Sequence, residues 1–95
     1  MVIRIDEAKI KEIADHYGLM SQLRQLAEEC SELSVESLHY TKERGATERI
    51  SEEIVDVLIM IQQIIYLLRN DVEKLEKYAE FKLDRQLSRI EKEQE

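Results

Sequence analysis

Residues 50–68, ISEEIVDVLIMIQQIIYLL, decide the fold of this 95-residue chain. Apolar side chains recur there at spacings of three and four, which predicts a helix with one main apolar stripe. That stripe comprises Ile50, Ile54, Val57, Leu58, Ile61, Ile65 and Leu68. Further apolar residues, such as Ile59 and Met60, occupy much of the remaining circumference. A helix apolar on most sides is expected to be central, with more neighbours than one hairpin partner supplies.

The rest of the chain predicts three more helices around this one. The sequence contains no proline and only two glycines, which argues against a sheet protein with its many turns. One helix is expected over residues 6–17, with Asp6 as N-cap and Gly18 as the stop. A second is expected over 19–44, ended by Gly45. Thr47 or Ser51 is expected to cap the helix quoted above.

Asn70 or Asp71 is expected to cap a final helix that runs to about Glu91, with a frayed tail. Because the connections are short, successive long helices should pack antiparallel. The expected fold is therefore one all-α domain over residues 1–95, an antiparallel bundle of about four helices. A monomer of this size buries only about 60 to 65% of its unfolded surface, so we expect oligomerisation to complete the core.

Charge and cysteine content limit the classes of function. The net charge is −7, which disfavours binding to nucleic acid. Cys30 is the only cysteine, and it is expected to be a small core residue in a reducing, cytoplasmic setting. The N-terminus lacks the apolar region of a signal peptide, and the apolar run 57–61 is far shorter than a membrane span of about 20 residues. We therefore expect neither export nor a membrane partner.

Two acidic pairs carry the chemical signal. Glu29 and Glu32 lie three residues apart in LAEECSEL, and Glu53 and Asp56 are three apart in ISEEIVDVL. Residues three apart on a helix share a face, so each pair points in one direction. Counted from the intervening loop, Glu32 and Asp56 lie about 18 and 14 Å along their helices, so the pairs come level. The sequence thus predicts a four-carboxylate cluster.

Such a cluster needs a compensating charge or proton. Two carboxylates about 4 Å apart repel by about 4 kcal/mol at an effective dielectric constant of about 20. Mg²⁺, with Mn²⁺ as a substitute, is a hard cation that prefers carboxylate ligands. Protonation of some carboxyls, or ion pairs with Arg24, Arg44 or Arg49, would be alternatives. Glu28 faces away from the apolar stripe of its helix and is expected to be solvated.

The two motifs, EECSE at 28–32 and EIVD at 53–56, resemble the EExxE and ExxD signature of the MazG-like, all-α nucleoside triphosphate pyrophosphohydrolases. The resemblance covers about residues 19–68, and more loosely the last helix. It implies Mg²⁺-dependent hydrolysis of a nucleotide to its monophosphate and pyrophosphate by a homodimer or homotetramer. It also implies that Glu29, Glu32, Glu53 and Asp56 are catalytic metal ligands, with Glu28 and Glu36 as auxiliary ligands or water-orienting groups.

Lys82, Arg85 and Arg89 share one face of the last helix, where they either contact substrate phosphate or form a solvated basic face. Two other functions stay open. One is a non-catalytic helical oligomer or adaptor that retains the fold. The other is a phosphoribosyl-ATP pyrophosphatase, although the glycine- and proline-containing entry segment usual in that family is missing here. The asparagine and lysine pattern that larger MazG-like members place after ExxD is also missing.

Overall fold

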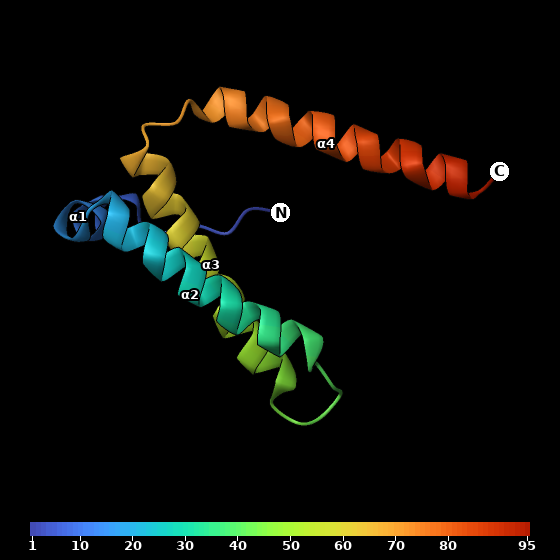
Figure 1. Cartoon of the computed structure of the whole chain (residues 1–95), viewed down its shortest axis with the longest axis horizontal. Helices are drawn as coiled ribbons and strands as arrows, with labels where there is room; N and C mark the ends of the chain where they lie inside the picture. Colours follow the sequence, from blue (N-terminus) through green and yellow to red (C-terminus); the bar gives the residue numbers. More distant parts are fainter.

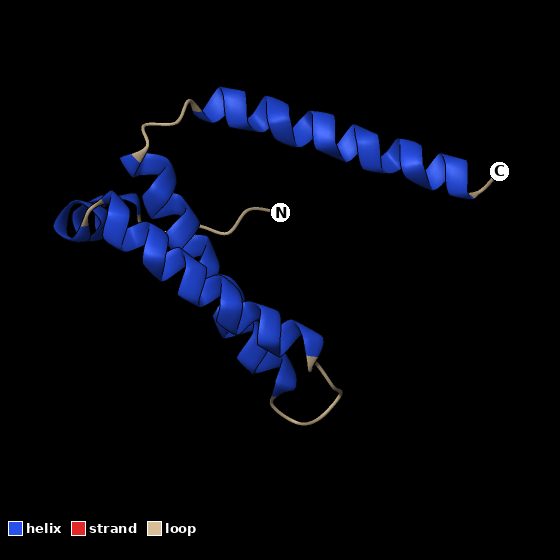
Figure 2. Ribbon diagram, in the orientation of Figure 1, coloured by secondary structure: helices blue, strands red, loops and turns tan.

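The computed structural model describes all residues, 1–95, and contains four α-helices and no strand (Figure 2). In chain order these are α1 (Glu7–Tyr17), α2 (Leu19–Leu38), α3 (Ala46–Leu67) and α4 (Val72–Glu93). The predicted all-α class with four helices is confirmed. α2 and α3 form an antiparallel hairpin, α1 packs across the end of it, and α4 runs away from it (Figure 1).

The ends of α1 follow the predicted chemistry. The Asp6 side chain accepts a hydrogen bond of 3.1 Å from the backbone N–H of Lys9, and this satisfies one of the free donors of the first turn. Gly18 has φ +81°, and its N–H donates to the carbonyl of Ala14 at 2.8 Å. α2 begins at the next residue, so α1 and α2 meet at a corner with a single residue between them.

The connection between α2 and α3 is longer than predicted. α2 ends at Leu38, six residues before the expected Arg44. α3 then begins after Gly45, which has φ +86° and offers no side-chain cap. The predicted caps at Thr47 and Ser51 are therefore wrong. The Thr47 hydroxyl instead forms a 2.9 Å hydrogen bond with the Tyr40 hydroxyl.

The core is small, and no residue of the predicted stripe of α3 is fully buried in it. Only seven of the 95 residues are buried: Ile10, Ala14, Gln22, Ala46, Met60, Gln63 and Ile64. Ile54 and Ile61, from the predicted main stripe, remain exposed. α2 and the short α1 together cover only part of the circumference of α3, so its apolar residues cannot all be buried within one chain. Cys30 is also exposed, and its prediction as a core residue is wrong.

The expectation that α4 packs antiparallel on α3 is wrong within this chain. Asp71 caps α4 as predicted, by accepting from the N–H of Glu73 at 3.0 Å. The helix then continues to Glu93, two residues beyond the predicted end and through most of the tail expected to fray. It contacts none of the other helices, and none of its residues is buried (Figure 1). None of the four helices is long and apolar enough to cross a membrane.

Candidate metal centre

The two predicted acidic pairs meet across the α2–α3 hairpin. Carboxylate oxygens of Glu29 on α2 and of Glu53 and Asp56 on α3 lie within 4.8 Å of one another. Glu32 is exposed and lies outside this triad, but its charge is near enough to raise the pKa of Glu53. The antiparallel packing of the helices and the three-residue spacing within each pair produce this convergence. We call Glu29, Glu32, Glu53 and Asp56 the acidic cluster.

Two oxygens of the acidic cluster are buried without a partner. Gln25 donates its amide N–H to Oε1 of Glu29 at 2.9 Å, one helical turn before it. The other oxygen of Glu29, Oε2, is buried and accepts no hydrogen bond, and the same is true of Oε2 of Glu53. A buried carboxylate oxygen without a donor costs free energy. The cluster therefore has acceptor atoms that the chain itself does not satisfy.

No basic side chain compensates the acidic cluster. The structure contains two ion pairs, Lys11 with Glu7 and Arg49 with Glu36, and neither involves a cluster residue. The Arg49 Nε to Glu36 Oε2 distance is 3.9 Å, so Glu36 faces the basic side chain nearest the loop end of the hairpin. The cluster therefore does not form the ion pairs with Arg24, Arg44 or Arg49 that were the first alternative to a metal. The second alternative is protonation of some of its carboxyls.

Crowding and burial favour protonation of two cluster residues. Partial burial raises the pKa of Glu53, and the nearby charges of Glu32, Asp56 and Glu29 raise it further. Burial likewise raises the pKa of Asp56, with additional contributions from Glu29 and Glu52. Glu53 is half-buried, whereas Asp56 faces a shallow hollow that Ser51, Glu52 and Val55 also line. The site is therefore open on the side of Asp56.

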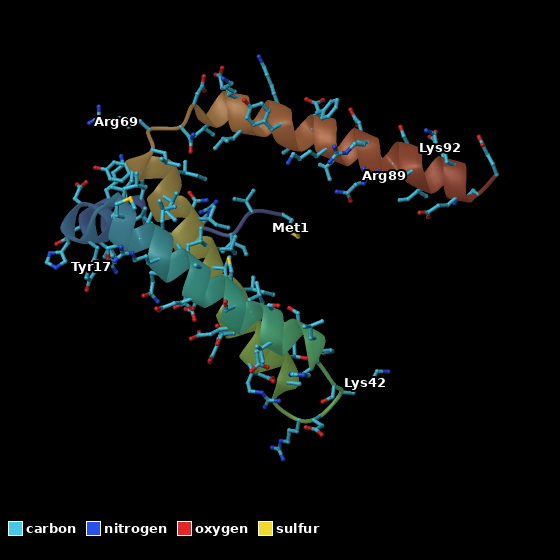
Figure 3. The ribbon with its side chains drawn as sticks, in the orientation of Figure 1. Met1, Tyr17, Lys42, Arg69, Arg89 and Lys92 are labelled. Atoms are coloured by element: carbon cyan, nitrogen blue, oxygen red, sulfur yellow. The ribbon has the colours of Figure 1, made fainter.

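The remaining predicted site residues lie elsewhere. Glu28 is exposed, as expected from its position opposite the apolar stripe, and it is not part of the triad. Lys82, Arg85 and Arg89 are exposed along α4, which does not touch the hairpin. Figure 3 shows Arg89 on that isolated helix, away from α2 and α3. Within one chain the structure does not bring these cations to the acidic cluster.

Sequence reasoning missed a polar continuation of the cluster along the hairpin. Gln22 on α2 and Gln63 on α3 are almost fully buried, and the Oε1 atom of each lacks a hydrogen-bond partner. The signal was present, because Gln22 and Gln63 each lie seven residues, about two helical turns, from Glu29 and Asp56 on the same faces. The α2–α3 interface therefore carries a polar seam where apolar contacts were expected.

A larger groove of about 640 Å³ lies at the other end of α3. Side chains of α1, of the end of α3 and of the α3–α4 turn line it, among them Lys11, Asp15, Tyr66 and Arg69. The Tyr66 hydroxyl donates to both carboxylate oxygens of Asp15, at 2.9 and 3.0 Å. Tyr66 is ten residues beyond Asp56 on α3, about 15 Å along the helix axis, so this groove is separate from the acidic cluster.

Comparison with known proteins adds no relative. A scan against protein-family models gives no match, and searches of curated proteins and of solved structures give none either.

Proposed function

We propose that this protein is a Mg²⁺-dependent nucleotide pyrophosphohydrolase that releases pyrophosphate from a nucleoside triphosphate or deoxynucleoside triphosphate to leave the monophosphate. The observation that carries the proposal is the convergence of Glu29, Glu53 and Asp56, with Glu32 beside them and with no basic partner. The resemblance of the two acidic motifs to the MazG-like enzymes supplies the reaction. Mn²⁺ is proposed as a substitute ion.

The donor set suits a hard divalent cation. Mg²⁺ takes oxygen ligands and is commonly held by a few carboxylates together with substrate phosphates and water. Glu29, Glu53 and Asp56 offer three carboxylates within one ion's reach, and the buried Oε2 atoms of Glu29 and Glu53 have no competing donor. These ligands fit the ion, and the open side at Asp56 leaves room for a phosphate chain.

Each group then has a chemical role. Bound Mg²⁺ supplies positive charge against phosphate oxygens and lowers the pKa of a bound water. Glu32 does not belong to the compact triad, but it is exposed beside it, and its charge raises the pKa of Glu53. An exposed carboxylate next to the ligands can accept the proton of an attacking water. We therefore propose Glu29, Glu53 and Asp56 as ligands, and Glu32 as a ligand or as the general base.

The other predicted residues receive weaker roles. Glu36 is engaged by Arg49 and acts at most by orienting water at the loop end of the site. Glu28 is exposed and is proposed only as an auxiliary group. Lys82, Arg85 and Arg89 would contact substrate phosphate only after α4 moves or a second copy brings them close. A homodimer or homotetramer in the cytoplasm, without nucleic-acid or membrane partners, completes the proposal.

The test is a pyrophosphate-release assay on the full chain with a panel of ribo- and deoxyribonucleoside triphosphates, with and without Mg²⁺. We expect one or more nucleotides to give stoichiometric monophosphate and pyrophosphate only when Mg²⁺ is present. The matched control is Glu48→Gln, which removes an exposed acid from the same helix outside the cluster. No release from any nucleotide by a folded, Mg²⁺-binding protein would favour the non-catalytic oligomer instead.

A further inference from the structure

The single chain exposes far more surface than a compact protein of its mass. Its accessible surface is 8284 Å² at 11.3 kDa, whereas a compact monomer of that mass exposes about 5,700 Å². The excess is about 2,500 Å² per chain. Two copies that buried it against each other would form an interface of about 5,000 Å², which lies in the range of obligate dimers. The excess is therefore as large as the surface that obligate dimers bury.

Part of this surface is a stripe on α4. Val72, Leu75, Ala79, Leu83, Leu87 and Ile90 recur at spacings of three and four and lie on one side of the helix. Leu83 and Leu87 are 60% and 59% exposed. A lone helix with such a stripe gains little from its own hydrogen bonds, because helices in proteins are stabilised mainly by packing an apolar face. The α4 stripe therefore needs a covering surface.

A second apolar stripe, partly exposed, runs along α3. It comprises Ile54, Leu58, Ile61, Ile65 and Leu68; Ile54, Ile61 and Leu68 are 40%, 37% and 50% exposed, and Leu58 and Ile65 between them are half-buried. At about 100° per residue, Ile54, Leu58 and Ile61 lie about 140 to 160° around the helix from Asp56. A helix packed on this α3 stripe would leave Asp56, and with it the open side of the acidic cluster, uncovered. The α4 and α3 stripes are about 27 and 21 Å long at about 1.5 Å per residue, so the α4 stripe can cover the whole α3 stripe and extends about one turn beyond it.

The α3–α4 turn directs α4 away from its own hairpin. Arg69 has φ +54°, its N–H donates to the carbonyl of Tyr66, and the N–H of Asn70 donates to that of Ile65. These two bonds form a Schellman motif, which fixes the exit direction of the chain. Asp71 already caps α4, so only Asn70 lies between the two capped ends. Figure 3 places Arg69 at this turn, with α4 leading away from it.

Charge also fits a second copy. Residues 1–71 contain 14 acidic and eight basic side chains, whereas α4 contains six of each. Two strongly acidic hairpins pressed together would repel each other, but a neutral helix adds no net charge to the acidic body. On α4, the basic residues Lys82 and Arg89 border the apolar stripe on one side, where they can face acidic side chains of the partner.

From these observations we infer that α4 is an exchanged arm. In a homodimer, each copy's α4 lies with its apolar stripe against the α3 stripe of the other copy and completes that copy's helical bundle. The exchange explains why the chain contains a fourth helix that its own first three helices do not cover. It specifies which surfaces meet, and it does not rest on the proposed enzymatic function.

The test uses two variants of the full chain, with molar mass measured by sedimentation equilibrium. The arm variant carries Leu83→Glu and Leu87→Glu, and the groove variant carries Ile54→Glu and Ile61→Glu. Each pair of changes places charge in the proposed interface, so we expect each variant to be monomeric, with a dissociation constant at least about 100-fold above that of the wild type. Val35→Glu, at an exposed position on α2 outside both stripes, should leave the wild-type dimer intact.

Mixing the two variants gives the decisive result. The intact α4 of the groove variant can cover the intact α3 stripe of the arm variant, so a 1:1 mixture should form heterodimers, although neither variant dimerises alone. A dimeric arm variant would mean that the hairpins pair directly, and a dimeric groove variant would mean that the two α4 helices pair with each other. A monomeric wild type would mean that α4 folds onto its own chain. Any of these three results overturns the exchange. Far-ultraviolet circular dichroism checks that both variants stay helical.

Discussion

Asp15 on α1 and Glu53 on α3 are both carboxylates at helix contacts, but their surroundings differ. Asp15 receives two hydrogen bonds from the Tyr66 hydroxyl, at 2.9 and 3.0 Å, and Lys11 lies 5.8 Å from the ring of that tyrosine. Glu53 faces three other acids and has a buried oxygen without a donor. Both carboxylate oxygens of Asp15 thus accept from a donor within the chain. In the acidic cluster only Glu29 has a donor, the Gln25 amide, and one buried oxygen each of Glu29 and Glu53 accepts no hydrogen bond.

The largest expected difference between the two regions is in turnover. Glu53→Gln or Asp56→Asn removes a proposed ligand, and we expect kcat for pyrophosphate release to fall by about 100-fold or more. Asp15→Asn should change kcat little, because Asp15 lies at the other end of α3. Steady-state pyrophosphate release measures all three variants. Equal losses at both ends of α3 would show that the variants act through stability and not through the site.

Mg²⁺ should raise the free energy of unfolding in a way that depends on the acidic cluster and not on Asp15. A ligand at 100 times its dissociation constant adds about 2.7 kcal/mol to the free energy of unfolding. We expect MgCl₂ to produce this gain in the wild type and in Asp15→Asn. In Glu53→Gln most of the gain should be absent. Urea denaturation with and without MgCl₂, against NaCl of matched ionic strength, measures the effect. An equal gain from NaCl would indicate general charge screening and no site.

The sequence predicted most of the cluster, and it was less successful with the packing around it. Helical spacing brought Glu29, Glu53 and Asp56 together as expected, because the phase of a helix depends only on residue number, whereas Glu32 lies outside this triad. It did not tell which of the apolar lines of α3 meets α2, since Ile54 and Met60 are equally apolar and only tertiary contacts distinguish them. The early end of α2 at Leu38 was missed because Ser37, His39 and Thr41 only weakly disfavour a helix.

The sequence also did not predict where α4 lies relative to the other helices. Its cap at Asp71 and its apolar stripe were predictable from local sequence, but its position was not. A short connection normally predicts an antiparallel neighbour. Here Arg69 adopts a positive φ that is uncommon for a residue other than glycine, and nothing in the sequence signals that conformation. The resulting turn keeps α4 off its own hairpin.

A moderate effect is expected at the corner between α1 and α3. Tyr66→Phe removes the donor to Asp15 and should lower the free energy of unfolding by about 1 to 2 kcal/mol. In the metal-free protein Glu53→Gln should act in the opposite direction, because it removes a repelled charge. Urea denaturation of both variants in a chelator compares the two signs. Destabilisation by Glu53→Gln in the absence of metal would show that Glu53 has a structural partner after all.

The smallest expected effect is the pH dependence of the stability difference between Glu53→Gln and the metal-free wild type. It is small because the acidic cluster is partly open to solvent. Glu53 and Asp56 have pKa values raised in the folded state by burial and by neighbouring acids, so the folded metal-free protein binds protons more readily than the unfolded chain. At neutral pH both carboxyls are ionised, and their charges lower the free energy of unfolding by the full amount. This destabilisation is relieved as the pH falls through the raised pKa values towards the ordinary values, 4.5 for Glu53 and 3.8 for Asp56.

The stability advantage of Glu53→Gln over the metal-free wild type should therefore be largest at neutral pH and shrink as the pH is lowered. Taking the difference between the two proteins cancels the titration of the other carboxylates. Urea denaturation in a chelator from about pH 4.5 to 7.5 follows this difference. The Asp15 carboxylate already has a donor in the wild type, so Asp15→Asn should not show a stability advantage that shrinks towards acidic pH. An advantage that grew towards acidic pH would mean that Glu53 is stabilised as a carboxylate, and the region would then resemble the Asp15 corner and no longer require an external cation.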